Sequence, residues 1–294
     1  MAIKSINRLA KEAEERNLLL SDMVAKEEAV EAGMTEAEVR SRMQGMLIAM
    51  NEAVKAGVAR SGPSVSGLTG GESLRYSNYL REHKSLLGDV AGKAAAYALA
   101  ASCVNASMGV IVAAPTAGSC GILPGVLLSL REAHGFTDEE IISGLLAAAG
   151  VGQAIALRAT LSGAEGGCQS ECGSAAAMAA AAAVELMGGS PEQCCHGAAL
   201  ALKNSLGLVC DPVAGLVEVP CVKRNGVYAV VALAAADMAL AGIKSAIPLD
   251  EVIDAMHAIG QVMPVTLRET AKGGLAATPT GCRLQAKVFP DQGE

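Results

Sequence analysis

The sequence predicts an all-α fold: a compact Ala/Gly-rich helical domain with an N-terminal helical extension. Helix-capping patterns recur along the chain, and each opens a segment of periodic apolar residues. These patterns are Thr35 with Glu38, Thr137 with Glu140, and Ser190-Pro191 with Gln193. Alternating strand patterns with hairpin turns are missing, and only MGVIVAAP (108–115) and GLVEVPCV (215–222) favour short extended pieces.

The composition indicates a core of small side chains. Of the 294 residues, 51% are hydrophobic, but only 2% are aromatic and none is Trp. Ala, Gly, Val and Leu therefore fill the interior, and helices can approach one another closely. The net charge of −7 argues against a nucleic-acid-binding protein, which would need a basic face.

Neither a signal peptide nor a membrane span is expected. The N-terminus, MAIKSINRLAKEAEERN, is charged and amphipathic and lacks an apolar core, so we expect a cytoplasmic protein. The apolar runs elsewhere are mostly alanine, and Gly, Ser, Glu or Lys interrupts them before the roughly 18 residues typical of a span. Ala-rich helices packed inside the protein explain these runs better.

The elements follow one another in two parts. Residues 1–60 are charged and helical, with roughly heptad-like spacing of Leu and Met, and form the predicted extension. Residues 61–294 form the predicted main domain, whose apolar body begins near Gly88 after a glycine-rich stretch. A helix is expected from about Gln169, so that its partial positive N-terminus lies beside Cys168 and favours the thiolate.

Two loops rich in glycine and hydroxyl side chains are candidates for ligand binding. They are GPSVSGLTGG (62–71) and AAPTAGSCGILPG (113–125). Their backbone N–H groups can approach a ligand closely, but neither loop has the Gly-Lys-Ser/Thr ending of a phosphate-binding loop. Each loop alone is also typical of a tight turn between helices. Together they favour a small anionic ligand.

The nine cysteines are many for a cytoplasmic chain, where metal binding or catalysis is the usual role of grouped thiols. Cys168, Cys210 and Cys221 each adjoin Gly or Pro turn residues. Their spacing matches neither a zinc finger nor a ferredoxin. Three thiolates suit an iron–sulfur cluster of four irons in which one iron stays open. Spacing alone leaves Cys172, four residues after Cys168, as a further candidate ligand.

The motifs SGLTGG, APTAGSCGILPG, SGAEGGCQSECG and CDPVAGLVEVPCVKRN, in this order, resemble the α subunit of bacterial iron–sulfur-dependent L-serine dehydratase of the two-subunit type. The resemblance covers essentially the whole chain. It implies an all-helical catalytic domain at 61–294 and a 4Fe–4S cluster on Cys168, Cys210 and Cys221. It also implies conversion of L-serine to pyruvate and ammonia, a reaction of amino-acid degradation and gluconeogenesis. Cys172 departs from the family pattern, so we expect it not to be a ligand.

The resemblance implies that the two loops bind the substrate. Hydroxyls and exposed N–H groups bind a carboxylate without adding a competing charge. We expect them to hold the carboxylate or amino group of L-serine. The residues are Ser66, Thr69 and Gly70 in the first loop and Thr116, Ala117 and Gly118 in the second. A pyridoxal mechanism would instead need a lysine beside a phosphate-binding loop, and Lys93, the best such lysine, has none.

The general base is not identified by the sequence. None of the four histidines lies in a motif of the family, whose Ser-Ser-His-Thr-like segment belongs to the β portion. We therefore expect a β subunit, a second copy of this chain, or both to complete the pocket. Cysteine desulfidation with the same cluster, and a non-catalytic iron–sulfur sensor or scaffold, stay open as alternatives. Cys282 is an open candidate for capping the free iron, against a packing or surface role.

Overall fold

The computed structural model describes residues 3–290, and the part described is all-α, as the sequence predicted. Its α-helices are α1 (Ile6–Glu15), α2 (Leu20–Ala32), α3 (Glu36–Val58), α4 (Glu72–Glu82), α5 (Gly88–Asn105), α6 (Ile122–His134), α7 (Asp138–Arg158), α8 (Gly163–Gly166), α9 (Ser174–Leu186), α10 (Pro191–Lys203), α11 (Cys221–Leu240), α12 (Leu249–Val262) and α13 (Pro279–Val288). Short 3₁₀ segments are η1 (Ala117–Ser119), η3 (Val213–Gly215), η4 (Val265–Leu267) and η5 (Gly274–Ala277), and η2 (Gln169–Gly173) is a π-helical turn.

The predicted helix starts are confirmed. Thr35, Thr137 and Ser190 are the N-caps of α3, α7 and α10, and each forms a reciprocal capping box with the residue three positions on. The two stretches that favoured extended pieces form no strand in the part of the chain described. Residues 109–115 are irregular, and residues 215–222 pass from η3 through a turn into α11. Both stretches contain a cis X–Pro peptide bond.

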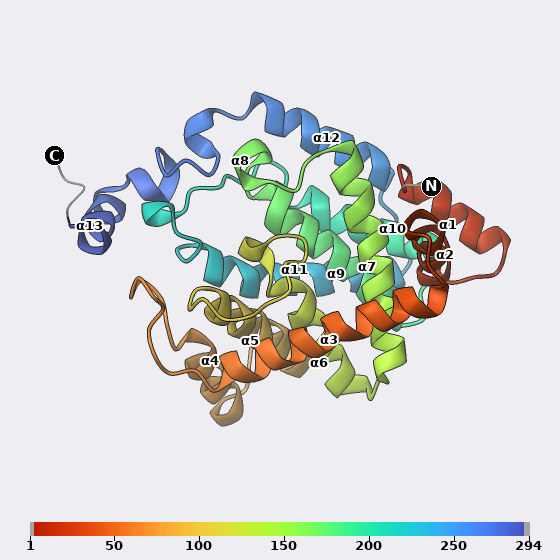
Figure 1. The fold of residues 1–294 in the computed structure, drawn as a ribbon, viewed down its shortest axis with the longest axis horizontal. Coiled ribbons are helices and arrows are strands. Elements are labelled where there is room, and N and C mark those ends of the chain that lie inside the picture. Colours follow the sequence, from red (N-terminus) through yellow and green to blue (C-terminus); the bar gives the residue numbers. More distant parts are fainter. Residues whose placement is uncertain (1–2, 291–294) are drawn as a thin grey trace.

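The central helix is α9, whose alanines are completely buried. It packs against α6, α7, α10 and α11, which surround it in Figure 1. Small residues also allow close approach elsewhere: a Cβ on Gly125 of α6 would lie 2.6 Å from the carbonyl oxygen of Ala94 in α5. Alanine and glycine thus replace bulky side chains as the means of close helix packing.

The N-terminal helices α1–α3 belong to the same buried cluster as the central helices, through residues such as Ile6, Leu20 and Leu47. α1 packs against α10, α2 against α7, and α3 against α5, while α13 lies at the opposite end of the molecule from the N-terminus (Figure 1). The division at residue 60 into an extension and a catalytic domain stays a prediction.

Helix α7 is the single helix, among the residues described, that is long and apolar enough to cross a membrane by length and composition. Its most apolar window has a mean hydropathy of 1.6, and 67% of that window is buried inside the molecule. Because α7 packs against α9, α2 and α3, its apolar surface is accounted for by the core. Its length is therefore weak evidence for a span.

Candidate metal and substrate site

The three cysteines predicted as ligands lie at or near the ends of helices, and all three are buried. Cys168 precedes the π-helical turn η2, which leads into α9. The predicted helix from Gln169 is thus present, but its first turn is π-helical. Such turns are frequent at functional sites. Cys210 lies between α10 and η3, and Cys221 is the first residue of α11.

Cys168 is the thiol with the most acidic character. Hydrogen-bond contacts with Cys172 and Cys210, followed by the nearby guanidinium of Arg224, hold the pKa of Cys168 well below its ordinary value. The Sγ atoms of Cys168 and Cys172 are 3.4 Å apart. Burial, followed by the charge of Cys168, raises the pKa of Cys221 to about 12. One thiolate surrounded by further thiols is a donor set that suits iron and sulfide.

Arg224 holds the backbone around Cys210. Its guanidinium donates to the carbonyl oxygen of Val209 at 2.9 Å and to Oδ1 of the buried Asp211 at 2.9 Å. Asp211 in turn accepts the N–H of Leu275 at 2.8 Å. The Cys210 segment is therefore fixed from both sides. The positive charge of Arg224 compensates the charge of a Cys168 thiolate and of Asp211 together.

Glu171 lies where the cysteines meet the second loop. Its Oε2 is 3.5 Å from the Sγ of Cys210, and its Oε1 accepts a 2.9 Å hydrogen bond from the hydroxyl of Thr116. Burial, followed by the charge of Cys168, raises the pKa of Glu171 to about 7. Ligand atoms of Glu171, Cys210 and Glu269 all lie within 4.8 Å of one another. Carboxyl groups thus border the thiol site on one side.

The second loop lies beside Glu171, and its role in substrate binding stays a prediction. Thr116 points at Glu171, and a Cβ on Gly118 would lie 3.0 Å from Oε1 of the same carboxyl group. Asn225 of α11 ties the loop down: its amide donates to the carbonyl oxygen of Gly118 and accepts the N–H of Gly121, both at 2.8 Å. A side chain at position 118 would make a tight contact with the carboxyl group of Glu171, which would have to shift slightly.

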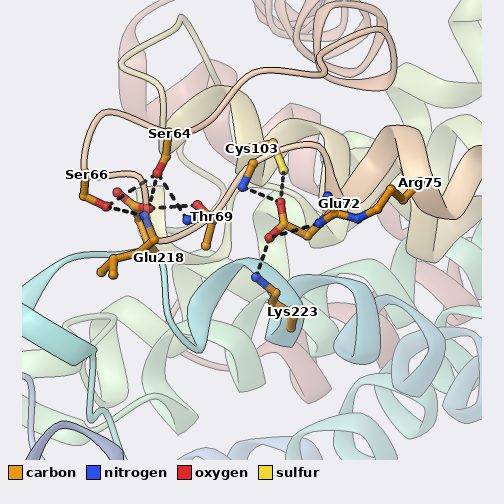
Figure 2. Close-up of polar contacts among 10 residues, drawn as sticks. Ser64, Ser66, Thr69, Glu72, Arg75, Cys103, Glu218 and Lys223 are labelled. Carbon is orange, nitrogen blue, oxygen red and sulfur yellow. Dashed lines mark hydrogen bonds and ion pairs between the residues drawn. The ribbon is translucent and has the colours of Figure 1, made fainter. Parts of the chain in front are cut away.

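The first loop shares a cavity with Ala117 of the second, but donors of the first loop are bonded to the protein itself (Figure 2). The hydroxyl of Thr69 donates to the carboxylate of Glu218 at 2.8 Å, and the N–H of Gly70 donates to Glu72 at 2.6 Å. Ser66 lines a cavity of about 620 Å³ that Ala117 and Glu218 also line. Of the three residues predicted in this loop, Ser66 is the one that faces the cavity.

Sequence reasoning assigned no role to several polar residues here, among them Glu171, Arg224, Glu218, Glu72 and Lys223. Lys223 and Arg224 stand two and three positions after Cys221 in the motif VPCVKRN, and that proximity was the available signal. Glu218 precedes Cys221 by three positions. Sequence pattern does not show which distant side chain a carboxylate meets, so their partners emerge only from the fold.

The other candidate residues lie elsewhere. Cys282 is exposed on α13, and its thiol contacts the carbonyl oxygen of Ala276 at 3.8 Å. Three of the histidines make local contacts along the chain: His83 with Tyr79, His134 with Phe136 and His196 with Glu192. Lys93 pairs with Glu132 at 3.0 Å on the surface.

The fold and the site together define a class of protein. Its members are all-α, and a buried group of thiols and carboxyls lies beside two hydroxyl-rich loops. The chain matches the family model for the serine dehydratase alpha chain over residues 15–276, and it belongs to that family.

Curated relatives agree with this assignment. A protein of Bacillus subtilis (strain 168) named "Probable L-serine dehydratase, alpha chain" is 57% identical over 77% of this chain and 75% of its own length. The "L-serine dehydratase, alpha chain" of Peptoniphilus asaccharolyticus is 45% identical over 92% of this chain and 93% of its own. "L-serine dehydratase 1" of Escherichia coli (strain K12) is 46% identical over 61% of this chain but only 40% of its own length.

Proposed function

We propose that this chain is the catalytic α subunit of a cytoplasmic, iron–sulfur-dependent L-serine dehydratase, a lyase that converts L-serine to pyruvate and ammonia without pyridoxal phosphate. One observation carries the proposal: within a family of serine dehydratase alpha chains, Glu171 joins the Thr116 loop to the Cys168–Cys210 thiol pair. Substrate-binding hydroxyls and soft metal donors thus belong to one site.

Cys168, Cys210 and Cys221 are the residues that would hold a 4Fe–4S cluster. When bound on three thiolates, such a cluster supplies an open iron that acts as a Lewis acid on the serine hydroxyl. The buried thiols, the lowered pKa of Cys168 and the guanidinium of Arg224 support this donor set. The Sγ of Cys172 lies 3.4 Å from that of Cys168, and in our proposal Cys172 is not itself a ligand.

The substrate would be held mainly by the second loop. Thr116 donates its hydroxyl proton to Glu171, so its oxygen is left to accept from the amino group of L-serine, and a Cβ at Gly118 would lie against Glu171. Ser66 of the first loop lines the same cavity as Ala117, so it can contact a substrate bound there. The donors of Thr69 and Gly70, in contrast, are bonded to Glu218 and Glu72. We therefore assign direct substrate contact to Ser66, Thr116, Ala117 and Gly118, and an indirect role to Thr69 and Gly70.

Glu171 is the acid–base group of this chain in our proposal. Loss of water from L-serine requires removal of the α-proton, and the enamine formed becomes an imine that hydrolyses to pyruvate and ammonia. The carboxyl of Glu171 lies between the Thr116 hydroxyl and the Cys210 thiol, so it is within reach of a molecule bound at either. A carboxyl in this position holds or takes up a proton at Oε2, because Oε1 accepts from Thr116.

A β subunit is the proposed partner, alone or within a larger homo-oligomer. The relatives named alpha chain imply a second chain, and the Escherichia coli relative extends well beyond the matched part. We expect the isolated chain to turn over L-serine weakly or not at all, and to regain turnover on addition of the β chain of the same organism. Full specific activity of the isolated chain would show that catalysis requires no partner.

Pyruvate release separates the proposed function from its alternatives. The anaerobically reconstituted protein, with its partner, is supplied with L-serine or L-cysteine at equal concentrations. A serine dehydratase releases pyruvate faster from L-serine, and a cysteine desulfidase releases it faster from L-cysteine together with sulfide. Release from neither substrate, with an intact cluster, would favour an iron–sulfur sensor or scaffold.

A further inference from the structure

The first loop is fastened at two points to the short segment that carries Cys221. The first point is Glu218, which is buried and accepts hydrogen bonds from the hydroxyls of Ser64 at 2.5 Å and Thr69 at 2.8 Å (Figure 2). Thr69 and Ser64 are buried as well. A buried carboxylate left without these donors would be costly, so the loop and Glu218 hold each other in place.

The second point is the ion pair of Lys223 and Glu72. The ammonium of Lys223 lies 2.6 Å from Oε1 of Glu72, while Oε2 accepts the N–H of Gly70 and a weak contact from the thiol of Cys103. The side chain of Glu72 is only 13% exposed, whereas that of Lys223 is 50% exposed. The position of the Glu72 carboxylate is therefore fixed by Gly70 of the first loop and Cys103 of α5, and Lys223 reaches it from α11.

Cys221 lies between these two points, three residues after Glu218 and two before Lys223. The backbone of this segment is also bonded internally: the N–H of Val222 donates to the carbonyl oxygen of Glu218 at 3.0 Å, and the N–H of Val213 donates to that of Val219 at 2.8 Å. A displacement at either fastening point is thus transmitted to the first turn of α11, where the thiol is attached.

We propose that Glu218 and the Glu72–Lys223 ion pair are positioning residues that fix the Cys221 thiol through the first loop. The hydroxyl and N–H groups of the first loop, which the sequence suggested for substrate binding, then hold Cys221 in position instead. Ser66, which lies between Ser64 and Thr69 in the sequence, lines the cavity, so a molecule bound there is coupled through the first loop to the position of Cys221. The fastening itself does not depend on the proposed function; only its effect on turnover does.

The test measures how fast each buried cysteine is alkylated in the reduced, metal-free chain at fixed pH, with iodoacetamide and site-resolved mass spectrometry. The variants are Lys223→Met, Glu72→Gln, their double mutant and Glu218→Gln. Lys93→Met is the matched control, because Lys93 is 47% exposed and forms a comparable ion pair with Glu132 at 3.0 Å. The buried Cys194 in α10 is the internal reference.

We expect each single variant to raise the Cys221 rate relative to Cys194 by about tenfold, as local opening becomes easier. The double mutant should equal Glu72→Gln, because Lys223 has lost its partner in that variant, whereas Arg75 still lies 3.9 Å from Glu72 in Lys223→Met. Lys223→Arg should restore the wild-type ratio. Lys93→Met should leave the ratio unchanged. An unchanged ratio in Lys223→Met and Glu218→Gln, or effects that add in the double mutant, would overturn the proposal. Since the readout needs neither metal nor L-serine, its failure is distinct from failure of the proposed function.

Discussion

The hydroxyl of Thr116 donates a 2.9 Å hydrogen bond to Oε1 of Glu171, across 55 positions of the chain. The bond joins the second glycine-rich loop to the turn that follows Cys168, and it leaves Oε2 of Glu171 facing Cys210. It connects the proposed substrate donors to the proposed cluster ligands, and the first two predictions concern its two ends.

Thr116→Val removes the hydroxyl while keeping the side-chain shape. We expect the KM for L-serine to rise by about tenfold, the effect of losing one hydrogen bond to a charged group, with iron–sulfur absorbance unchanged. Steady-state kinetics of the reconstituted holoenzyme measure this. If neither kcat nor KM changes, the loop is a structural turn and not a part of the substrate site.

Glu171→Gln keeps a side chain of the same size but removes the proton-accepting group. We expect kcat to fall by roughly 10² to 10⁴-fold, the usual contribution of a positioned acid or base. The KM and the cluster absorbance should change little. Glu269→Gln is the comparison variant, since Glu269 also lies by Cys210 but is only partly buried. A near wild-type kcat in Glu171→Gln would indicate that the partner chain, and not Glu171, supplies the general base.

Substitutions of two glycines in α3 test the close packing of this helix against α5. A Cβ on Gly57 would lie 2.1 Å from the carbonyl oxygen of Ala100, whereas a Cβ on Gly45 meets nothing within 4 Å. Gly57→Ala should lower the free energy of unfolding by roughly 1–3 kcal/mol through overpacking. Gly45→Ala should raise it by about 0.5–1 kcal/mol through helix propensity. Denaturant unfolding measures both, and equal effects would contradict the α3–α5 contact.

Glu185 of α9 predicts a pH dependence of stability. Burial raises the pKa of this carboxyl from 4.5 to about 7, and its Oε2 accepts the N–H of Ser21 at 3.1 Å. The folded chain therefore keeps a proton that the unfolded chain loses, so this group makes stability fall as pH rises from 4.5 to 7. Glu185→Gln should flatten the fall in Tm over this window, and Gln at the exposed Glu31 should not. An equal slope in wild type and Glu185→Gln would contradict the burial of this carboxyl.

Local patterns predicted the helices well, because capping boxes such as Thr35 with Glu38 are satisfied within four residues. The loop residues were harder. Hydroxyls and glycines mark a place where a carboxylate is bound, but the pattern does not distinguish a substrate from a carboxylate of the protein. In the second loop Thr116 meets Glu171 at the thiol site, while in the first loop Glu218 and Glu72 take the donors of Thr69 and Gly70. These pairings depend on packing between distant segments.

The most direct test of the central claim is the iron and acid-labile sulfide bound per chain after anaerobic reconstitution, read with the visible absorbance of the cluster. We expect four irons and four sulfides in the wild-type chain and in Cys172→Ala, as for one cluster on three thiolates. Cys168→Ala, Cys210→Ala and Cys221→Ala should each lose the cluster. Equal loss in Cys172→Ala, retention of the cluster in any of the other three variants, or stoichiometric zinc in place of iron would contradict the account.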